Sequence, residues 1–182
     1  MQPLWTVGIL EPGLCPVRRA LRRMLAQTAA PGQAVTFLPG RRALRPHPDG
    51  AYYRADALVA VPGFRTDRGF ESRIAVLPGT DAAAWRVRAG EVITYGLSAR
   101  DTLTLSSVTD DRLALAVQRE IVDVAGRRVD RQEITLRRPP RLELWQCLAC
   151  AGTLLAAGVD PARLPPLFAR RGGIAAQTAA YT

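Results

Sequence analysis

The sequence contains no lysine and no asparagine, and its one histidine is His47. Without lysine, the chain cannot supply the phosphate-contacting lysine of a G-x-x-x-x-G-K-[ST] nucleotide loop. A serine or cysteine triad needs a positioned histidine, and His47 stands between Pro46 and Pro48 in a loop-like stretch. We therefore expect His47 to be a surface residue, and we find no lysine-dependent or triad chemistry in the sequence.

Cysteine is also scarce, with three residues in 182. The odd number argues against a disulfide framework. Cys147 and Cys150 form a C-x-x-C inside an expected helix, whereas a redox motif belongs at a helix N-terminus. A zinc site would need two more ligands, and the candidates Cys15 and His47 are far away in sequence. Core packing is the favoured interpretation of this pair, with redox and metal roles as the alternatives.

Long apolar runs are missing as well, so we expect no membrane association. Residues 1–10 do not show a basic segment followed by an apolar stretch, which leads us to expect a cytoplasmic protein. Hydrophobic residues make up 48% and charged residues 23%, a balance typical of globular proteins. We expect one α/β domain over residues 1–170 and a flexible C-terminal tail over residues 171–182.

The net charge is +9, and all 25 basic residues are arginine. Such an excess is usually a solvated surface, but arginine also binds phosphate in a bidentate manner. Aromatic residues near the first-half arginines are few, which leaves little for base stacking. The candidate anion-binding residues are Arg18, Arg22, Arg41, Arg42 and Arg45.

The first half alternates between strand-like and helix-like segments. Residues 5–10, 34–38, 57–61 and 73–77 are continuous apolar runs, typical of strands covered on both faces. Residues 16–27 show a helical pattern with arginines on one side. A Pro-Gly pair follows each strand, and parallel strands would bring these loops to one ligand-binding edge. It is equally possible that the pairs only terminate strands. The candidate edge residues are Pro12, Gly13, Gly40, Gly63 and Gly79.

The second half has a different pattern. Alternating segments at residues 102–108, 113–124 and 127–136 predict antiparallel strands. Residues 142–157 predict a helix that is apolar nearly all round, and Asp160-Pro161 begins another short helix that Pro165-Pro166 interrupts. The expected fold is therefore α/β: a short, mostly parallel sheet flanked by helices, with an antiparallel strand extension and a C-terminal helical pair.

Four carboxylates in the second half are conceivable acid–base groups, but solvated cross-strand pairs with arginine explain them adequately, and they support no catalytic hypothesis. They are Asp110, Asp111, Glu120 and Glu133.

Several segments of the second half occur in a familiar order. Residues 92–98 read VITYGLS, Asp101 follows, a strand ends in EITL at residues 133–136, and an alanine-rich helix ends at Gly158. Over residues 73–170 this order resembles the closing part of the central domain of Mur ligases. That family uses a phosphate loop, a lysine and a His-Asn pair. Residues 7–13 hold the corresponding strand-to-helix position without the glycine spacing or the lysine.

The resemblance implies a catalytically silent relative, because the family's UDP-sugar and amino-acid domains are also missing at this length. We therefore expect a non-catalytic Mur-ligase-like accessory or interaction protein with an unknown protein partner, no cofactor, and a role beside a cell-envelope enzyme. One alternative is an arginine-mediated anion or nucleic-acid-binding module. Another is an enzyme with an unfamiliar site on the Pro-Gly loop edge.

Overall fold

The computed structural model describes residues 5–11, 16–28, 35–38, 52–64, 69–80 and 86–169. The elements of the first half are β1 (Trp5–Leu10), α1 (Pro16–Ala26), β2 (Val35–Leu38), β3 (Tyr52–Ala60), β4 (Gly69–Pro78) and β5 (Val87–Tyr95). Those of the second half are β6 (Leu103–Val108), β7 (Arg112–Val117), β8 (Ile121–Val122), β9 (Arg128–Val129), β10 (Gln132–Arg137), α2 (Leu144–Ala156), the 3₁₀ turn η2 (Pro161–Arg163) and α3 (Leu164–Ala169).

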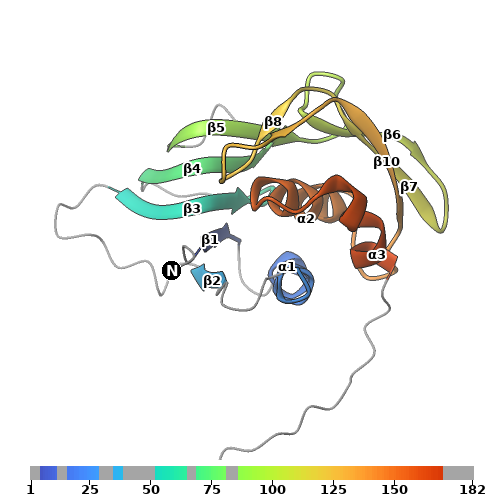
Figure 1. Cartoon of the computed structure of the whole chain (residues 1–182), viewed down its shortest axis with the longest axis horizontal. Helices are drawn as coiled ribbons and strands as arrows, with labels where there is room; N and C mark the ends of the chain where they lie inside the picture. The colour runs from blue at the N-terminus through green and yellow to red at the C-terminus, as the bar shows by residue number, and fades with distance from the viewer. Residues whose placement is uncertain are drawn as a thin grey trace, which may run out of the picture.

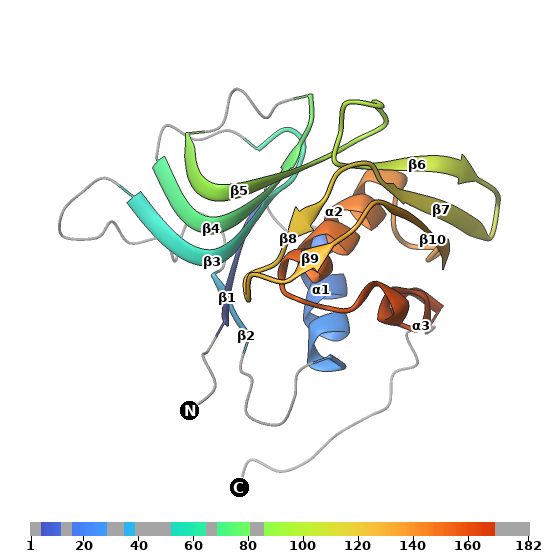
Figure 2. The same ribbon diagram turned by 45° about the horizontal axis from the view of Figure 1, so that its top comes forward.

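The main sheet has eight strands in the order β10-β7-β6-β5-β4-β3-β1-β2. Its strands run parallel except β7, which is antiparallel to both β6 and β10. β8 and β9 form a separate two-stranded hairpin. The expected α/β class is confirmed, with its mostly parallel sheet, antiparallel extension and C-terminal helical pair. Figure 2 shows the extension as a wing that turns away from β3–β5.

The sheet curls around α2, which lies on its concave side (Figure 1). Every residue from Gln146 to Ala156 is buried, as expected for a helix that is apolar nearly all round. Gly152 lies so close to the sheet that an added Cβ would be 2.9 Å from methyl groups of both Leu103 and Val76. The helix thus contacts strands of the parallel part and of the antiparallel part together.

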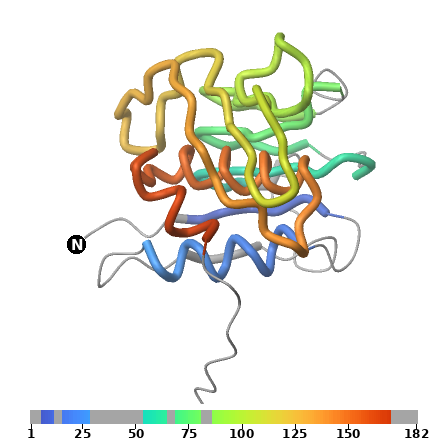
Figure 3. Tube along the Cα trace, turned by 90° about the vertical axis from the view of Figure 1, so that its right-hand side faces the viewer, coloured from blue at the N-terminus to red at the C-terminus, as the bar shows by residue number. Residues whose placement is uncertain are grey.

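The first helix, α1, packs on the same concave side as α2. Figure 3 shows both helices running roughly along the strand direction. Val17, Leu21 and Met24 are fully buried on one face of α1, while Arg19 and Arg23 are exposed on the other. The expected amphipathic pattern is therefore confirmed.

The parallel strands β3, β4 and β5 are joined by short connections. Residues 61–68 and residues 79–86 are eight residues each, whereas parallel strands normally need a crossover of a dozen residues or more, usually a helix. Each strand pairs with the next at a constant offset of 17 residues, for example Val59 with Val76 and Val76 with Ile93. Phe64 in the first connection is buried and so belongs to the core.

β3 and β4 begin earlier than the apolar runs at residues 57–61 and 73–77 suggest, at Tyr52 and Gly69. The added residues include charged side chains, and Arg54, Glu71 and Arg88 align side by side in the sheet. Phe70, in the first half of β4, is nevertheless buried. The expected segments were too short because an apolar run does not include the charged residues near the start of each strand.

The two long alternating segments of the second half are each divided in the structure. Residues 113–124 form β7 and then β8, and residues 127–136 form β9 and then β10. The chain leaves the main sheet at Gln118 to build the β8–β9 hairpin, which contacts α2. Alternation identified strand-forming residues correctly but did not show that they divide between two sheets.

The expected interruption at Pro165-Pro166 is wrong. Both prolines lie in the first turn of α3, where backbone N–H groups have no intrahelical acceptor in any case. Asp160 accepts a hydrogen bond from the Ala162 N–H at 2.8 Å and so caps the preceding turn, as expected. In the part of the chain that the structure describes, no helix is long and apolar enough to cross a bilayer.

Candidate functional site

The carboxyl ends of β1, β3, β4 and β5 lie along one edge of the sheet, because these strands are parallel. Open parallel sheets bind their ligands at this edge. The residues that follow the strands there are Glu11, Pro62-Gly63, Gly79 and Gly96. Gly63 and Gly79, two of the candidate edge residues, therefore share an edge. We call it the carboxyl edge.

Glu11 is the first residue after β1, and it is only 3% exposed. Its Oε1 lies 3.0 Å from Nε of Arg18, which belongs to the first turn of α1. The carboxylate therefore sits beside the N-terminal end of a helix that follows a strand. In α/β proteins, free backbone N–H groups and the helix dipole make this a favourable position for a ligand phosphate. In this chain, Glu11 brings its own negative charge to that position.

Asp101 lies on the carboxyl edge beside the ends of β4 and β5. Its side chain is buried, and Oδ2 accepts a hydrogen bond from the Ser98 N–H at 3.1 Å. A Cβ added at Gly79 or at Gly96 would overlap the Asp101 carboxylate. Gly79 therefore serves to let a carboxylate of the chain approach the ends of β4 and β5.

A buried tyrosine connects the carboxyl ends of β3 and β5. Tyr95, the last residue of β5, donates a hydrogen bond from its hydroxyl to the Ala60 carbonyl at 2.8 Å. Ala60 ends β3, so the ring spans β4. The carboxyl edge is thus cross-linked by polar contacts within the chain.

Neither the family models nor the curated proteins compared with this sequence give a match. The function must therefore be argued from the geometry of the chain itself.

The candidate anion-binding arginines are only partly described. Arg18 is engaged by Glu11, and Arg22, one turn further along α1, is exposed and takes part in an interaction of its own. The other candidates lie outside the described residues: Arg41, Arg42, Arg45, Pro12, Gly13 and Gly40. Of the expected arginine cluster, the structure brings together Arg18 and Arg22, on one helix.

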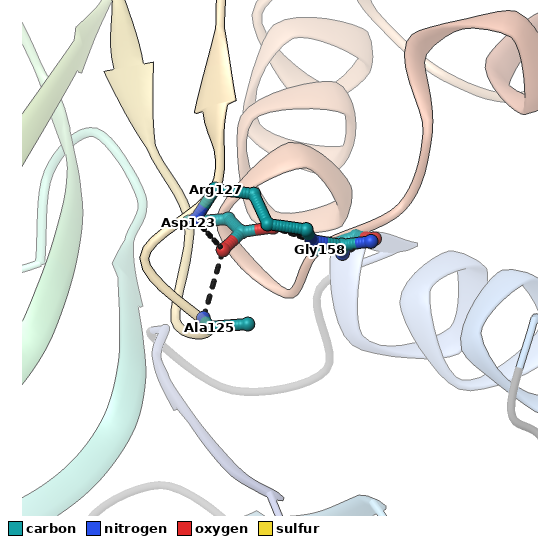
Figure 4. Close-up of polar contacts among 4 residues, drawn as sticks. All are labelled: Asp123, Ala125, Arg127 and Gly158. Atoms are coloured by element: carbon teal, nitrogen blue, oxygen red, sulfur yellow. Dashed lines mark hydrogen bonds and ion pairs between the residues drawn. The ribbon is translucent and has the colours of Figure 1, made fainter.

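A second polar cluster, which the sequence did not suggest, joins the β8–β9 hairpin to the end of α2 (Figure 4). Asp123 is 5% exposed and accepts hydrogen bonds from the N–H groups of Ala125 at 2.8 Å and Arg127 at 2.9 Å. Its Oδ2 also lies 2.8 Å from Nε of Arg127. Arg127 in turn donates to the Gly158 carbonyl, just beyond α2, where a cation is favoured by the helix dipole. Because these contacts connect two turns of the chain, the cluster stabilises the fold.

The C-x-x-C pair lies inside α2, as expected. Cys147 and Cys150 are buried, and neither forms a disulfide. Burial raises the pKa of the Cys147 thiol to about 11, against a smaller opposing effect of Arg138. A reactive cysteine needs a lowered pKa, so Cys147 is a packing residue. In the described residues, no group of three or more His, Cys, Asp or Glu side chains could hold a metal ion.

Proposed function

We propose that this protein is a non-catalytic, Mur-ligase-like accessory or interaction protein that acts beside a cell-envelope enzyme. One observation carries the non-catalytic part of the proposal. The buried carboxylate of Glu11, the first residue after β1, lies 3.0 Å from Arg18 in the first turn of α1, near the end of the helix where a ligand phosphate would bind.

A phosphate group could use this position only by displacing Glu11 or by lying against it. Removing one partner of a buried ion pair costs about 3–5 kcal/mol, because the remaining charge loses its compensation. Two anions close together in a low-dielectric environment repel each other strongly. Asp101 has a similar effect at the ends of β4 and β5, where its carboxylate fills the space above Gly79 and Gly96. The carboxyl edge is therefore better suited to holding the fold together than to binding a nucleotide.

Thermal-shift and calorimetric titrations with Mg-ATP and with UDP-sugars test the non-catalytic part. We expect no rise in melting temperature, no binding heat and no ATP hydrolysis by the wild-type chain. A variant with Glu11→Gln keeps the size of the side chain but removes its charge, and it serves as the matched comparison. Binding or hydrolysis by the wild type would contradict the proposal, and would favour an enzyme site on the carboxyl edge.

Isolation of the tagged chain from its native host tests the interaction part. We expect a cell-envelope enzyme to co-purify in a fixed ratio and to remain bound through a second purification step. A chain that emerges alone under mild conditions would count against an accessory role.

The arginine face of α1 supports a second candidate, an anion- or nucleic-acid-binding module. Arg19 and Arg23 are exposed on this helix, which contains no acidic residue to neutralise them. Binding to short DNA and RNA should then weaken steeply with salt, with a slope that falls by about two when R19Q and R23Q are combined. The double variant R119Q/R131Q, which removes exposed arginines elsewhere, is the control. No binding at low salt would end this candidate.

A further inference from the structure

Strand β10 forms one edge of the eight-stranded sheet and pairs only with β7 (Figure 2). Glu133, Thr135 and Arg137 are exposed on one face of the strand. On the opposite face Ile134 and Leu136 are buried and Gln132 is exposed. α3 packs against β10, but none of the hydrogen bonds of the described residues joins α3 to the strand. Within the described residues, no second strand therefore pairs with the outer side of β10.

The hydrogen-bond pattern shows which backbone groups point outward. The Arg138 N–H donates to the Asp111 carbonyl at 2.8 Å, and this pair continues the β10–β7 register. Because bonded and non-bonded pairs alternate in an antiparallel ladder, Gln132, Ile134 and Leu136 bond to β7. The remaining residues of the strand are Glu133, Thr135 and Arg137. Their backbone N–H and C=O groups point away from the sheet.

The other side of β7 supports this assignment independently. The Gln118 N–H donates to the Thr102 carbonyl at 2.8 Å, so alternate residues of β7 bond to β6 and the rest bond to β10. Within the described part of the chain, no hydrogen bond engages the six outward groups of β10.

The edge is complementary to itself. In an antiparallel pairing centred on Thr135, Glu133 faces Arg137 of a second copy, and this ion pair occurs twice because the arrangement is two-fold. All three outward residues then fall in hydrogen-bonded pairs, which satisfies their backbone groups. On the buried face, Ile134 stands opposite Leu136 of the second copy, so apolar residues also meet.

Other registers lose this match. Shifting one strand by two residues places Glu133 or Arg137 opposite Thr135, and both ion pairs disappear. Shifting it by four places Glu133 opposite Glu133, or Arg137 opposite Arg137, which is destabilising. Arg137 already stands directly opposite Arg112 within the sheet, so it gains most from a carboxylate on its free side. In the single chain, the Ser106 hydroxyl of β6 donates a hydrogen bond to Oε2 of Glu133 at 2.6 Å, so the Glu133 side chain leans across β7 and must turn toward the edge when the second copy pairs.

We propose that β10 is a self-association surface, at which two copies of this chain join their sheets through a two-fold antiparallel β10–β10 pairing. Charges on edge strands often serve only to discourage pairing, as do prolines. Here the charges favour one register of pairing, and Pro139 and Pro140 follow Arg137 and Arg138 outside the paired residues.

Analytical ultracentrifugation from about 1 µM to about 200 µM tests the proposal, because a six-residue edge with two ion pairs suits a micromolar affinity. We expect the average mass to rise from one chain toward two. Glu133→Arg and Arg137→Glu should each weaken association at least about tenfold, because like charges then face each other. The double variant Glu133→Arg/Arg137→Glu should restore it.

Glu91→Arg is the matched control, since Glu91 is exposed on β5 and lies outside the β10 pairing. Circular dichroism and melting temperature establish that each variant is folded. Amide exchange gives a second readout: exchange at Glu133, Thr135 and Arg137 should slow as concentration rises, while exchange at Ile134 should not change. A monomer at every concentration would overturn the proposal, as would single variants that associate like the wild type or a folded double variant that fails to associate.

Discussion

At the scale of single residues, three buried carboxylates of the described chain have partners in the chain itself. Glu11 pairs with Arg18, Asp101 accepts the Ser98 N–H, and Asp123 accepts three donors. A buried charge is tolerated only when it is paired or hydrogen-bonded. Because these carboxylates bind groups of the chain itself, they stabilise turns and helix ends.

Replacing Asp123 tests that structural role. Asp123→Ala should lower the free energy of unfolding by about 2 kcal/mol, because two backbone N–H groups and the Arg127 guanidinium lose their acceptor. Asp123→Asn should lose less, since its amide oxygen still accepts from the backbone. Urea denaturation measures both. Glu120→Ala, which breaks the exposed pair with Arg128, is the control and should cost less than about 0.5 kcal/mol. Equal losses for Asp123→Ala and Glu120→Ala would refute the argument.

Gly79 offers a steric test at the same scale. Gly79→Ala should destabilise the chain by about 1–3 kcal/mol, because the new methyl group overlaps the Asp101 carboxylate. Combining it with Asp101→Ala removes the overlapping atoms, so the double variant should lose less than the sum of the two single losses. Chemical denaturation of the wild type, the two single variants and the double variant measures all four free energies of unfolding in this double-mutant cycle. Additive losses would show that the two side chains do not meet.

At the scale of elements, α2 shows how burial controls chemistry. Burial raises the pKa of Cys147 from 9.0 to about 11, so the folded chain keeps the neutral thiol where the unfolded chain ionises. The thiol therefore contributes stability that is fully present below pH 9 and is lost as the pH rises toward 11. No lysine titrates in this window, because the chain has none.

We expect the melting temperature to fall between pH 9 and pH 11, and to fall less in Cys147→Ala. At pH 8, a thiol reagent should label Cys147 slowly in the folded chain and rapidly in denaturant. Combining Cys15→Ala with Cys150→Ala leaves Cys147 as the only thiol of the chain, so the labelling can be assigned. Rapid labelling of Cys147 in the folded protein would contradict the packing role.

Helices with a clear hydrophobic period could be predicted from the sequence. Strand limits that depend on pairing with neighbouring strands could not. The faces of α1 and the all-round burial of α2 follow from side-chain spacing alone. β3, β4 and β5 pair at a constant offset of 17 residues, but the glycines that follow the strand ends, Gly63, Gly79 and Gly96, are spaced unequally in the sequence. The offset could not be predicted from these glycines, because the first halves of the strands share no obvious pattern.

The candidate site was predictable to a smaller extent. Pro-Gly spacing located Gly63 and Gly79 at a common edge, since parallel strands place their carboxyl ends together. The partners of Arg18 and Gly79 could not be read in the same way, because Glu11 and Asp101 reach them only after the strands have paired. The one local signal was an acidic residue directly after an apolar strand and shortly before an arginine-rich helix.

At the scale of the whole molecule, the curled sheet makes α2 the centre of one core. This helix contacts β3, β4, β5, β6 and β8, and so joins the parallel part to the antiparallel wing. β5 and β6 themselves meet at a single pair, Tyr95 with Leu103. The two parts of the sheet are therefore held together mainly by the helix and hardly by strand pairing.

This arrangement predicts one cooperative unfolding transition, because neither part of the sheet can lose its packing without exposing α2. Far-UV circular dichroism and the labelling of Cys147 should give the same midpoint in urea. Gly152→Val inserts methyl groups between Leu103 of the wing and Val76 of the parallel part, which are each 2.9 Å from the Cβ position. It should lower stability by about 1–3 kcal/mol and move both midpoints together. Ala162→Val, at an exposed position, should change stability by less than about 0.5 kcal/mol. Two separate midpoints, or a variant that shifts only one, would mean that the wing and the parallel strands fold as independent units.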